Sequence, residues 1–209
     1  MECLVEEKVQ VQFEPIATSS MRIGIMGGTF NPIHQAHLAM AEQVRKQLQL
    51  DEIWFIPDNI PPHKEVANQV SAKDRCAMLE LATHGNQYFH VKLFEILRGG
   101  VSYTVDTLRY LKKKAPKNQY YLIMGTDQVN DFPKWREPDK ITRLANLVGV
   151  KRPNYPTNEI NYPVIWVDAP MLEISSTQIR NLVANGGSIR YLVPEAVRLY
   201  IDSRGLYRD

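Results

Sequence analysis

Cysteine is scarce in this sequence: among 209 residues there are only two, Cys3 and Cys76. Two cysteines supply neither a disulfide framework nor a cysteine-based zinc site, which indicates a reducing, cytoplasmic setting. Long apolar runs are also lacking, and no stretch approaches the length that spans a bilayer. The net charge is only +2, which argues against a broad nucleic-acid-binding surface, although locally clustered cations could still bind phosphate groups.

Two widespread phosphate-binding signatures are missing as well. Neither the fingerprint G-x-G-x-x-G nor the phosphate-loop pattern that ends in Gly-Lys-Ser/Thr occurs. A different strand, turn and helix is present at residues 22–48. Ile23 and Ile25 predict a short buried strand that Gly27 and Gly28 end, and apolar residues at three- and four-residue steps predict the helix. Free N–H groups and the helix dipole favour an anion at such a turn.

Two histidines lie at the start of this helix. His34 and His37 are three residues apart and therefore share one face of it. Each imidazole could donate a hydrogen bond to a phosphate at the turn. However, many α/β proteins have a Gly-Gly pair after the first strand, and a lone histidine is usually structural. Spacing alone leaves a phosphate site and a structural role equally open.

A resemblance favours the phosphate site. Residues 27–37 read GGTFNPIHQAH. This stretch resembles the G-G-T-F-D-P-x-H-x-G-H signature of the adenylyltransferases that join a mononucleotide to ATP. Asn31 stands for the usual Asp and Ala36 for the usual Gly, whereas both histidines are present.

Residues near the C-terminal end predict a second anion site. Ser175 or Ser176 is suited to cap a helix, and Arg180, one turn into that helix, can reach back to an anion at its N-terminus. Residues 174–180 read ISSTQIR, which resembles the second signature of the same enzymes, Ile-Ser-Ser-Thr-x-x-Arg.

Four shorter motifs between these signatures resemble one branch of the superfamily, the bacterial nicotinate mononucleotide adenylyltransferases. They are Pro-Pro-His-Lys at 61–64, Ser-Tyr-Thr at 102–104, Gly-x-Asp at 125–127 and Pro-x-Trp at 133–135. By spacing alone, Lys64 would be a solvated lysine and Trp135 a partly buried loop residue. Arg136 stands where an aromatic residue often follows the tryptophan in that family.

The resemblance and the strand positions together predict a set of site residues. Catalysis is implied for His34, His37 and Arg180; ATP binding for Gly27, Gly28, Gly125, Asp127, Ile174, Ser175, Ser176 and Thr177, with Arg152 added for its place after a strand; and mononucleotide binding for Thr29, Phe30, Lys64, Tyr103, Thr104 and Trp135. We expect no dedicated metal site, because Mg²⁺ would bridge phosphate oxygens largely through water.

The order of elements predicts an α/β fold, a Rossmann-like doubly wound parallel sheet with helices on both faces. Strands are predicted at 53–57, 91–94, 120–124, 146–150 and 164–167, and Thr104 is predicted to cap a helix. We expect residues 1–20 to be an N-terminal extension of unknown role without a secretory signal. Residues 21–209 are expected to form a single nucleotidyltransferase domain.

The activity implied by the resemblance is adenylyl transfer from ATP to nicotinate mononucleotide, giving deamido-NAD and pyrophosphate. An ionised phosphate is already a nucleophile, so the protein has to position the reactants and neutralise charge, without a covalent intermediate. Three alternatives stay open: nicotinamide mononucleotide as acceptor, phosphopantetheine as acceptor, or a nucleotide-binding regulatory module without catalysis. We expect neither nucleic acid nor membrane as a partner, and a homo-oligomer stays open.

Overall fold

The computed structural model describes residues 20–62, 70–151, 158–170 and 172–208. Lys64, Arg152 and all of the expected N-terminal extension except Ser20 lie outside the described residues. None of the described helices has the length and apolar character needed to cross a membrane.

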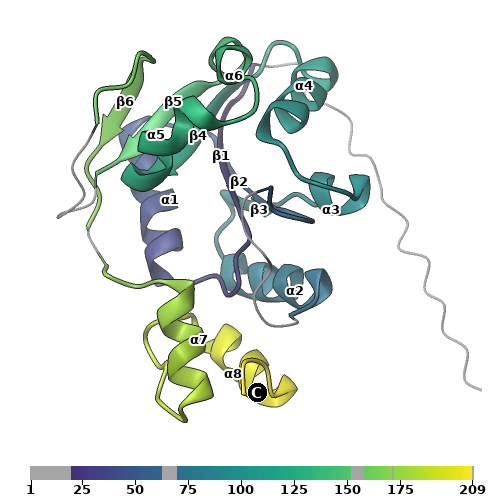
Figure 1. Ribbon diagram of the computed structural model, residues 1–209, viewed down its shortest axis with the longest axis vertical. Coiled ribbons are helices and arrows are strands. Elements are labelled where there is room, and N and C mark those ends of the chain that lie inside the picture. Colours follow the sequence, from purple (N-terminus) through teal and green to yellow (C-terminus); the bar gives the residue numbers. More distant parts are fainter. Residues whose placement is uncertain (1–19, 63–69, 152–157, 171, 209) are drawn as a thin grey trace, which may run out of the picture.

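A parallel sheet of six strands forms the centre of the protein, with the strand order β3-β2-β1-β4-β5-β6 (Figure 1). The strands are β1 (Arg22–Gly28), β2 (Glu52–Pro57), β3 (Phe89–Val91), β4 (Gln119–Gly125), β5 (Asn146–Val150) and β6 (Val164–Val167). The order reverses between β1 and β4, which is the point where open α/β sheets bind ligands beyond the carboxyl ends of their strands. The predicted Rossmann-like, doubly wound sheet is confirmed.

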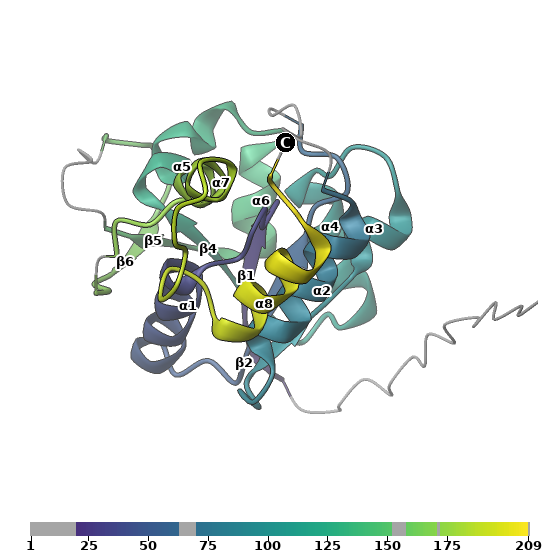
Figure 2. The same ribbon diagram turned by 90° about the horizontal axis from the view of Figure 1, so that it is seen from below.

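Helices cover both faces of this sheet (Figures 1 and 2). They are α1 (Gln35–Gln47), α2 (Ala72–Thr83), α3 (Phe94–Arg98), α4 (Thr104–Lys114), α5 (Thr126–Asp131), the 3₁₀ helix η1 (Phe132–Lys134), α6 (Pro138–Leu144), α7 (Ser176–Ala184) and α8 (Glu195–Arg204). Alternate residues of β4 point to opposite faces. Tyr121 and Ile123 therefore join the apolar cluster of α1 and α2, and Leu122 joins that of α4 and α6.

Gly24 allows the core to close tightly around β1. A Cβ atom at this position would lie 2.5 Å from Cδ1 of Ile53 and 3.0 Å from Cδ1 of Ile123. The side chains of the neighbouring strands thus fill the space that a larger residue at this position would need.

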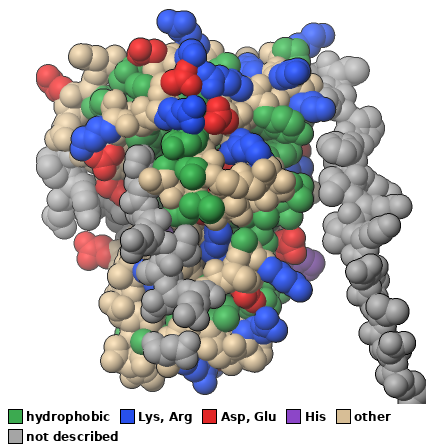
Figure 3. Space-filling model, turned by 45° about the vertical axis from the view of Figure 1, so that its right-hand side comes forward, with side chains coloured by type: hydrophobic (Ala, Val, Ile, Leu, Met, Phe, Trp, Pro, Cys, Tyr) green, Lys and Arg blue, Asp and Glu red, His purple; other side chains and the backbone are tan. Residues whose placement is uncertain are grey.

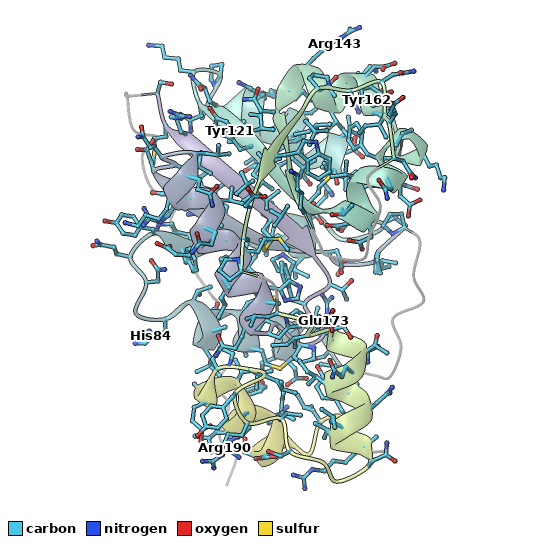
Figure 4. All side chains as sticks on the ribbon, turned by 90° about the vertical axis from the view of Figure 1, so that its left-hand side faces the viewer. His84, Tyr121, Arg143, Tyr162, Glu173 and Arg190 are labelled. Carbon is cyan, nitrogen blue, oxygen red and sulfur yellow. The ribbon has the colours of Figure 1, made fainter. Side chains whose placement is uncertain are left out.

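The two C-terminal helices lie beyond the carboxyl ends of the strands (Figures 1 and 2). Figure 4 shows Glu173 where the chain passes from the sheet to α7, and Arg190 at the far side of the helix pair. Ser175 caps α7, because its Oγ accepts a hydrogen bond from the backbone N–H of Gln178 at 3.2 Å. Gly186 follows the end of α7 with a φ of +70°, the left-handed conformation that glycine commonly adopts after a helix.

Two local predictions were wrong. Leu93 and Phe94 do not continue β3, which ends at Val91; instead, Leu93 precedes α3 and Phe94 begins it. A short apolar run does not distinguish a strand from a helix by itself. The N-cap of α4 is Tyr103, one residue before the predicted Thr104, and its side chain makes no capping hydrogen bond.

Candidate active site

The loop between β1 and α1 forms the floor of the candidate site. Its residue Phe30 has a φ of +49°, in the left-handed region that few non-glycine residues adopt, and its side chain is only 3% exposed. The Phe30 ring meets the His37 ring edge to face, with the centroids 5.3 Å apart. Because this ring lies in the core, Phe30 can offer a ligand only its backbone.

The two predicted histidines lie together at the start of α1. His34 is the N-cap residue and His37 the third residue of the helix, and their rings stack with centroids 3.7 Å apart. The backbone N–H of His34 donates to Nδ1 of His37 at 3.3 Å. A neutral imidazole that accepts at Nδ1 carries its hydrogen on Nε2. In this tautomer, the hydrogen-bond donor of the His37 ring is its Nε2–H.

The second predicted signature meets the first. Arg180 donates from Nη1 to the backbone oxygen of Asn31 at 2.8 Å and from Nη2 to Oγ1 of Thr177 at 3.1 Å. Ser176 donates from Oγ to the backbone oxygen of Pro32 at 2.8 Å. These bonds join segments that are 144 and 149 residues apart. The predicted anion sites at opposite ends of the chain are therefore neighbours.

A buried ion pair holds the carboxyl ends of β1 and β2 together. Arg75 of α2 is 2% exposed, and its Nη1 donates to the backbone oxygen of Thr29 at 2.7 Å and to Asp58 at 3.3 Å. The Asp58 carboxylate also accepts from Oγ1 of Thr29 at 2.8 Å. Thr29, a predicted mononucleotide contact, is therefore fixed from both sides. No sequence pattern indicates this pair, because an arginine on an amphipathic helix is usually solvated.

The end of β4 lies beside the end of β1. Ile25 is in register with Leu122, so Gly28 and Gly125, the last residues of their strands, lie at the same edge of the sheet. Gly125 is the N-cap of α5, and Asp127, its second residue, is exposed at this edge. Gly27, also at this edge, is exposed, and no atom lies within 4 Å of the position that its Cβ would occupy.

The predicted ring-binding segments also come together. The guanidinium carbon of Arg136 lies 4.5 Å from the centroid of the Tyr103 ring, so the residue after Trp135 rests on the N-cap of α4. Arg136 also lies 3.9 Å from the Asp106 carboxylate. Trp135 is half-buried, with its ring 5.6 Å from that of Phe132. The departure of Arg136 from the family pattern thus places a cation beside the predicted ring site.

A surface charge network links α4 to the loop that carries Trp135. Arg109 donates two hydrogen bonds from Nη2 to the carboxylate of Glu137, at 2.9 and 2.8 Å, and one from Nη1 to Asp106 at 3.0 Å. Glu137 has a φ of +54° and precedes α6. Acidic and basic side chains are intermixed at the top of the molecule, where α4 and α6 lie (Figure 3). Sequence reasoning missed this network.

A cavity of about 540 Å³ lies away from these residues, next to α7 and α8. Two of its arginines are already paired: Arg198 with Glu195 and Asp202 at 2.6 Å, and Arg208 with Asp202 at 3.1 Å. These carboxylates would repel a phosphate, so we do not assign the nucleotide to this cavity.

Comparisons with known proteins place this geometry in a family. A family model described as cytidylyltransferase-like matches residues 25–182. A relative in Enterococcus faecalis, named a probable nicotinate-nucleotide adenylyltransferase, is 46% identical over 96% of this chain and 92% of its own length. One of the same name in Lactiplantibacillus plantarum is 50% identical over 90% of this chain and 89% of its own length. The chain belongs to the nicotinate-nucleotide adenylyltransferases.

Solved structures agree with the fold of this family of nucleotidyltransferases. The Plasmodium falciparum nicotinic acid mononucleotide adenylyltransferase complexed with APC has a TM-score of 0.73 and 20% identity, over 90% of this chain and 97% of that one. A Vibrio parahaemolyticus structure described as a putative nicotinate-nucleotide adenylyltransferase has a TM-score of 0.67 and 19% identity, over 90% and 96%. At these identities the likeness concerns the fold alone. The resemblance seen in the motifs is confirmed at the level of the family, whereas the individual site residues stay predictions.

Proposed function

We propose that the protein transfers the adenylyl group of ATP to nicotinate mononucleotide. Two curated relatives, 46% and 50% identical over at least 90% of this chain, are named probable nicotinate-nucleotide adenylyltransferases. The observation that carries the proposal is the pair of hydrogen bonds from Arg180 and Ser176 to the loop before His34. These bonds support the proposal, because one triphosphate can bind both predicted anion sites only if they are neighbours.

The reaction needs no group on the protein to form a covalent bond. An oxygen of the mononucleotide phosphate attacks the α-phosphorus of ATP, and a new bond between this oxygen and phosphorus forms. The bond from the α-phosphorus to the bridging oxygen breaks, and its electron pair leaves with pyrophosphate. The protein accelerates this step by aligning the phosphates and by stabilising the negative charge that develops on them.

Each predicted catalytic side chain can donate a hydrogen bond to the phosphates. The Nε2–H of His37 donates to a phosphate oxygen of ATP, as does the ring of His34 beside it. Arg180 and the N-terminal N–H groups of α7, with the hydroxyls of Ser175 and Ser176, hold the pyrophosphate end. Trp135 and the N-terminus of α4 hold the nicotinate ring, and the carboxylate of Asp127 accepts from the ribose of ATP.

Mg²⁺ belongs to this proposal as a companion of ATP. It is a hard cation that retains several waters and binds phosphate oxygens. In the described part of the chain, no group of three or more His, Cys, Asp or Glu side chains could hold a metal ion. Hydroxyls, imidazoles and a guanidinium line the site, and they fit a cation that the triphosphate itself carries. When bound, the cation would offset charge on the phosphates.

The decisive experiment mixes the purified protein, ATP and Mg²⁺ with one acceptor at a time and measures pyrophosphate release and product mass. Nicotinate mononucleotide should give pyrophosphate and deamido-NAD in equal amounts. Nicotinamide mononucleotide and phosphopantetheine test the alternative acceptors. If no pyrophosphate is released with any of the three acceptors, the proposal is contradicted, and a regulatory nucleotide-binding module is favoured.

A further inference from the structure

The chain after α8 returns to the candidate active site. Gly205 ends α8 with a φ of +60°, and the backbone N–H of Leu206 donates to the carbonyl of Ile201 at 3.1 Å, which turns the chain back. Tyr207 follows with a φ of +64°, a conformation that non-glycine residues rarely adopt. Its side chain is 7% exposed and belongs to the same apolar cluster as Phe30 and Ile33.

The hydroxyl of Tyr207 bonds directly to the loop between β1 and α1. It donates to Oδ1 of Asn31 at 2.7 Å, across 176 residues of sequence, and the bond is buried. Burial raises the pKa of Tyr207 above its ordinary value, so the phenol stays protonated and remains a donor. Asn31 is itself only 5% exposed.

Asn31 joins this tyrosine to the predicted catalytic arginine. Its side chain accepts from Tyr207, and its backbone oxygen accepts from Nη1 of Arg180 at 2.8 Å. His34 follows three residues later. A shift of Asn31 would therefore move the acceptor that orients Arg180, and it would also move the loop that leads into the histidines.

We propose that Tyr207 is a positioning residue for adenylyl transfer: its hydroxyl fixes Asn31, and Asn31 in turn fixes the guanidinium of Arg180. This role rests on the proposed function. Tyr207 contacts neither the reacting phosphates nor the pyridine ring; it acts through Asn31. Since phosphate contacts are needed most as charge develops, losing this alignment reduces turnover more than it weakens substrate binding.

The test removes the phenolic oxygen of Tyr207. Tyr207→Phe keeps the ring in the core and removes only the donor to Asn31. We expect kcat to fall about fivefold, with the KM values of both substrates changed by less than about twofold, in line with the net value of one buried hydrogen bond.

A matched control is available on α8. The hydroxyl of Tyr200 donates to Oδ1 of Asp74 at 2.8 Å, on α2 rather than at the site. Tyr200→Phe also removes a phenolic donor from the C-terminal region, so it reports the general cost of such a change. We expect its kcat to equal that of the unmodified protein, and thermal unfolding of both variants separates lost stability from lost alignment.

A double-mutant cycle tests the route through Asn31. In an Asn31→Ala protein, Tyr207→Phe should have no further effect on kcat, because the acceptor is gone. Unchanged kcat in the single Tyr207→Phe variant, equal losses in Tyr200→Phe, or effects that multiply in the double variant would each overturn the proposal. An unmodified protein that releases no pyrophosphate from ATP and nicotinate mononucleotide contradicts the proposed function itself, and the positioning role with it.

Discussion

The backbone N–H of His34 donates to Nδ1 of His37, so the helix start determines which nitrogen of His37 can face a substrate. The same imidazole stacks on the His34 ring and meets the Phe30 ring edge to face. The His37 ring is thus held in one orientation, and in the proposed reaction its Nε2–H donates to a phosphate oxygen of ATP. Preorganised donors of this kind give large electrostatic contributions to catalysis.

Replacement of His37 by alanine should lower kcat by about 100-fold, with a much smaller rise in the KM for the mononucleotide. The reason is that the Nε2–H contact strengthens as negative charge develops on the phosphate. Steady-state kinetics with both substrates varied would measure the two effects separately. His37→Gln offers an amide N–H in place of Nε2–H and should retain more activity than His37→Ala.

His84 provides the control for this prediction. It caps the end of α2, is exposed, and lies apart from the carboxyl edge of the sheet (Figure 4). His84→Ala should leave both kinetic constants unchanged. Near-normal turnover in His37→Ala would remove His37 from the catalytic centre.

Gly27→Val should block ATP without harming the fold. The position has no positive φ, lies in a strand, and has open space where a side chain would start. Stability should therefore change by less than about 0.5 kcal/mol, as for other surface substitutions. If the phosphates pass this backbone, the valine occupies their place, and the KM for ATP should rise about tenfold or more, as for the loss of at least 1.4 kcal/mol.

Gly24→Val is the contrasting substitution in the same strand. A Cβ at this position would lie 2.5 Å from Cδ1 of Ile53, so Gly24→Val should lower the free energy of unfolding measured in urea, unlike Gly27→Val. An unchanged KM for ATP in Gly27→Val would show that the triphosphate does not approach this turn.

Trp135→Ala should chiefly raise the KM for nicotinate mononucleotide, by about tenfold, because ring stacking is worth on the order of 1 kcal/mol beyond the area buried. The KM for ATP should change little. Trp166, a half-buried tryptophan on the edge strand β6, gives a matched comparison. Trp166→Ala should leave the mononucleotide KM unaltered, and an equal rise in both variants would point to general loosening of the protein.

The fold and the outline of the site were largely predictable from the sequence. Strands β5 and β6 begin and end at the predicted residues, because each is a short apolar run between polar loops. Ser175 and Arg180 are placed by local rules, since a cap and a residue one turn later need no tertiary information. The family itself came from motif resemblance rather than from periodicity.

What the sequence did not reveal depends on contacts between distant segments. Arg75 looks like a surface residue of an amphipathic helix, and only the packing of α2 under the ends of β1 and β2 buries it. Tyr207 follows the last helix of the chain, and the residue that accepts its hydrogen bond lies 176 residues earlier. Residue type alone does not reveal a buried hydrogen-bond partner in a distant segment, because many tyrosines and arginines have no such partner.

Glu95 gives the protein a pH-dependent stability that is separate from catalysis. It is 8% exposed and accepts a hydrogen bond from Oγ1 of Thr107 at 2.6 Å. Burial raises the pKa of this carboxyl above its ordinary value, although its hydrogen bonds and Arg98 act in the opposite direction. The folded protein therefore keeps a proton on Glu95 at pH values where the unfolded chain has lost it.

The sign of the effect follows from this difference in bound protons. Between the unfolded pKa, near 4.5, and the raised folded pKa, the folded state binds more protons, so the free energy of unfolding falls as pH rises. Glu95→Gln keeps the neutral shape and an oxygen for Thr107, and should gain stability relative to the unmodified protein as the pH is raised through this window. Urea unfolding at a series of pH values measures this difference, with Glu80→Gln, an exposed position on α2, as the control. A difference that stays constant with pH would mean that Glu95 loses its proton as readily in the folded protein as in the unfolded chain.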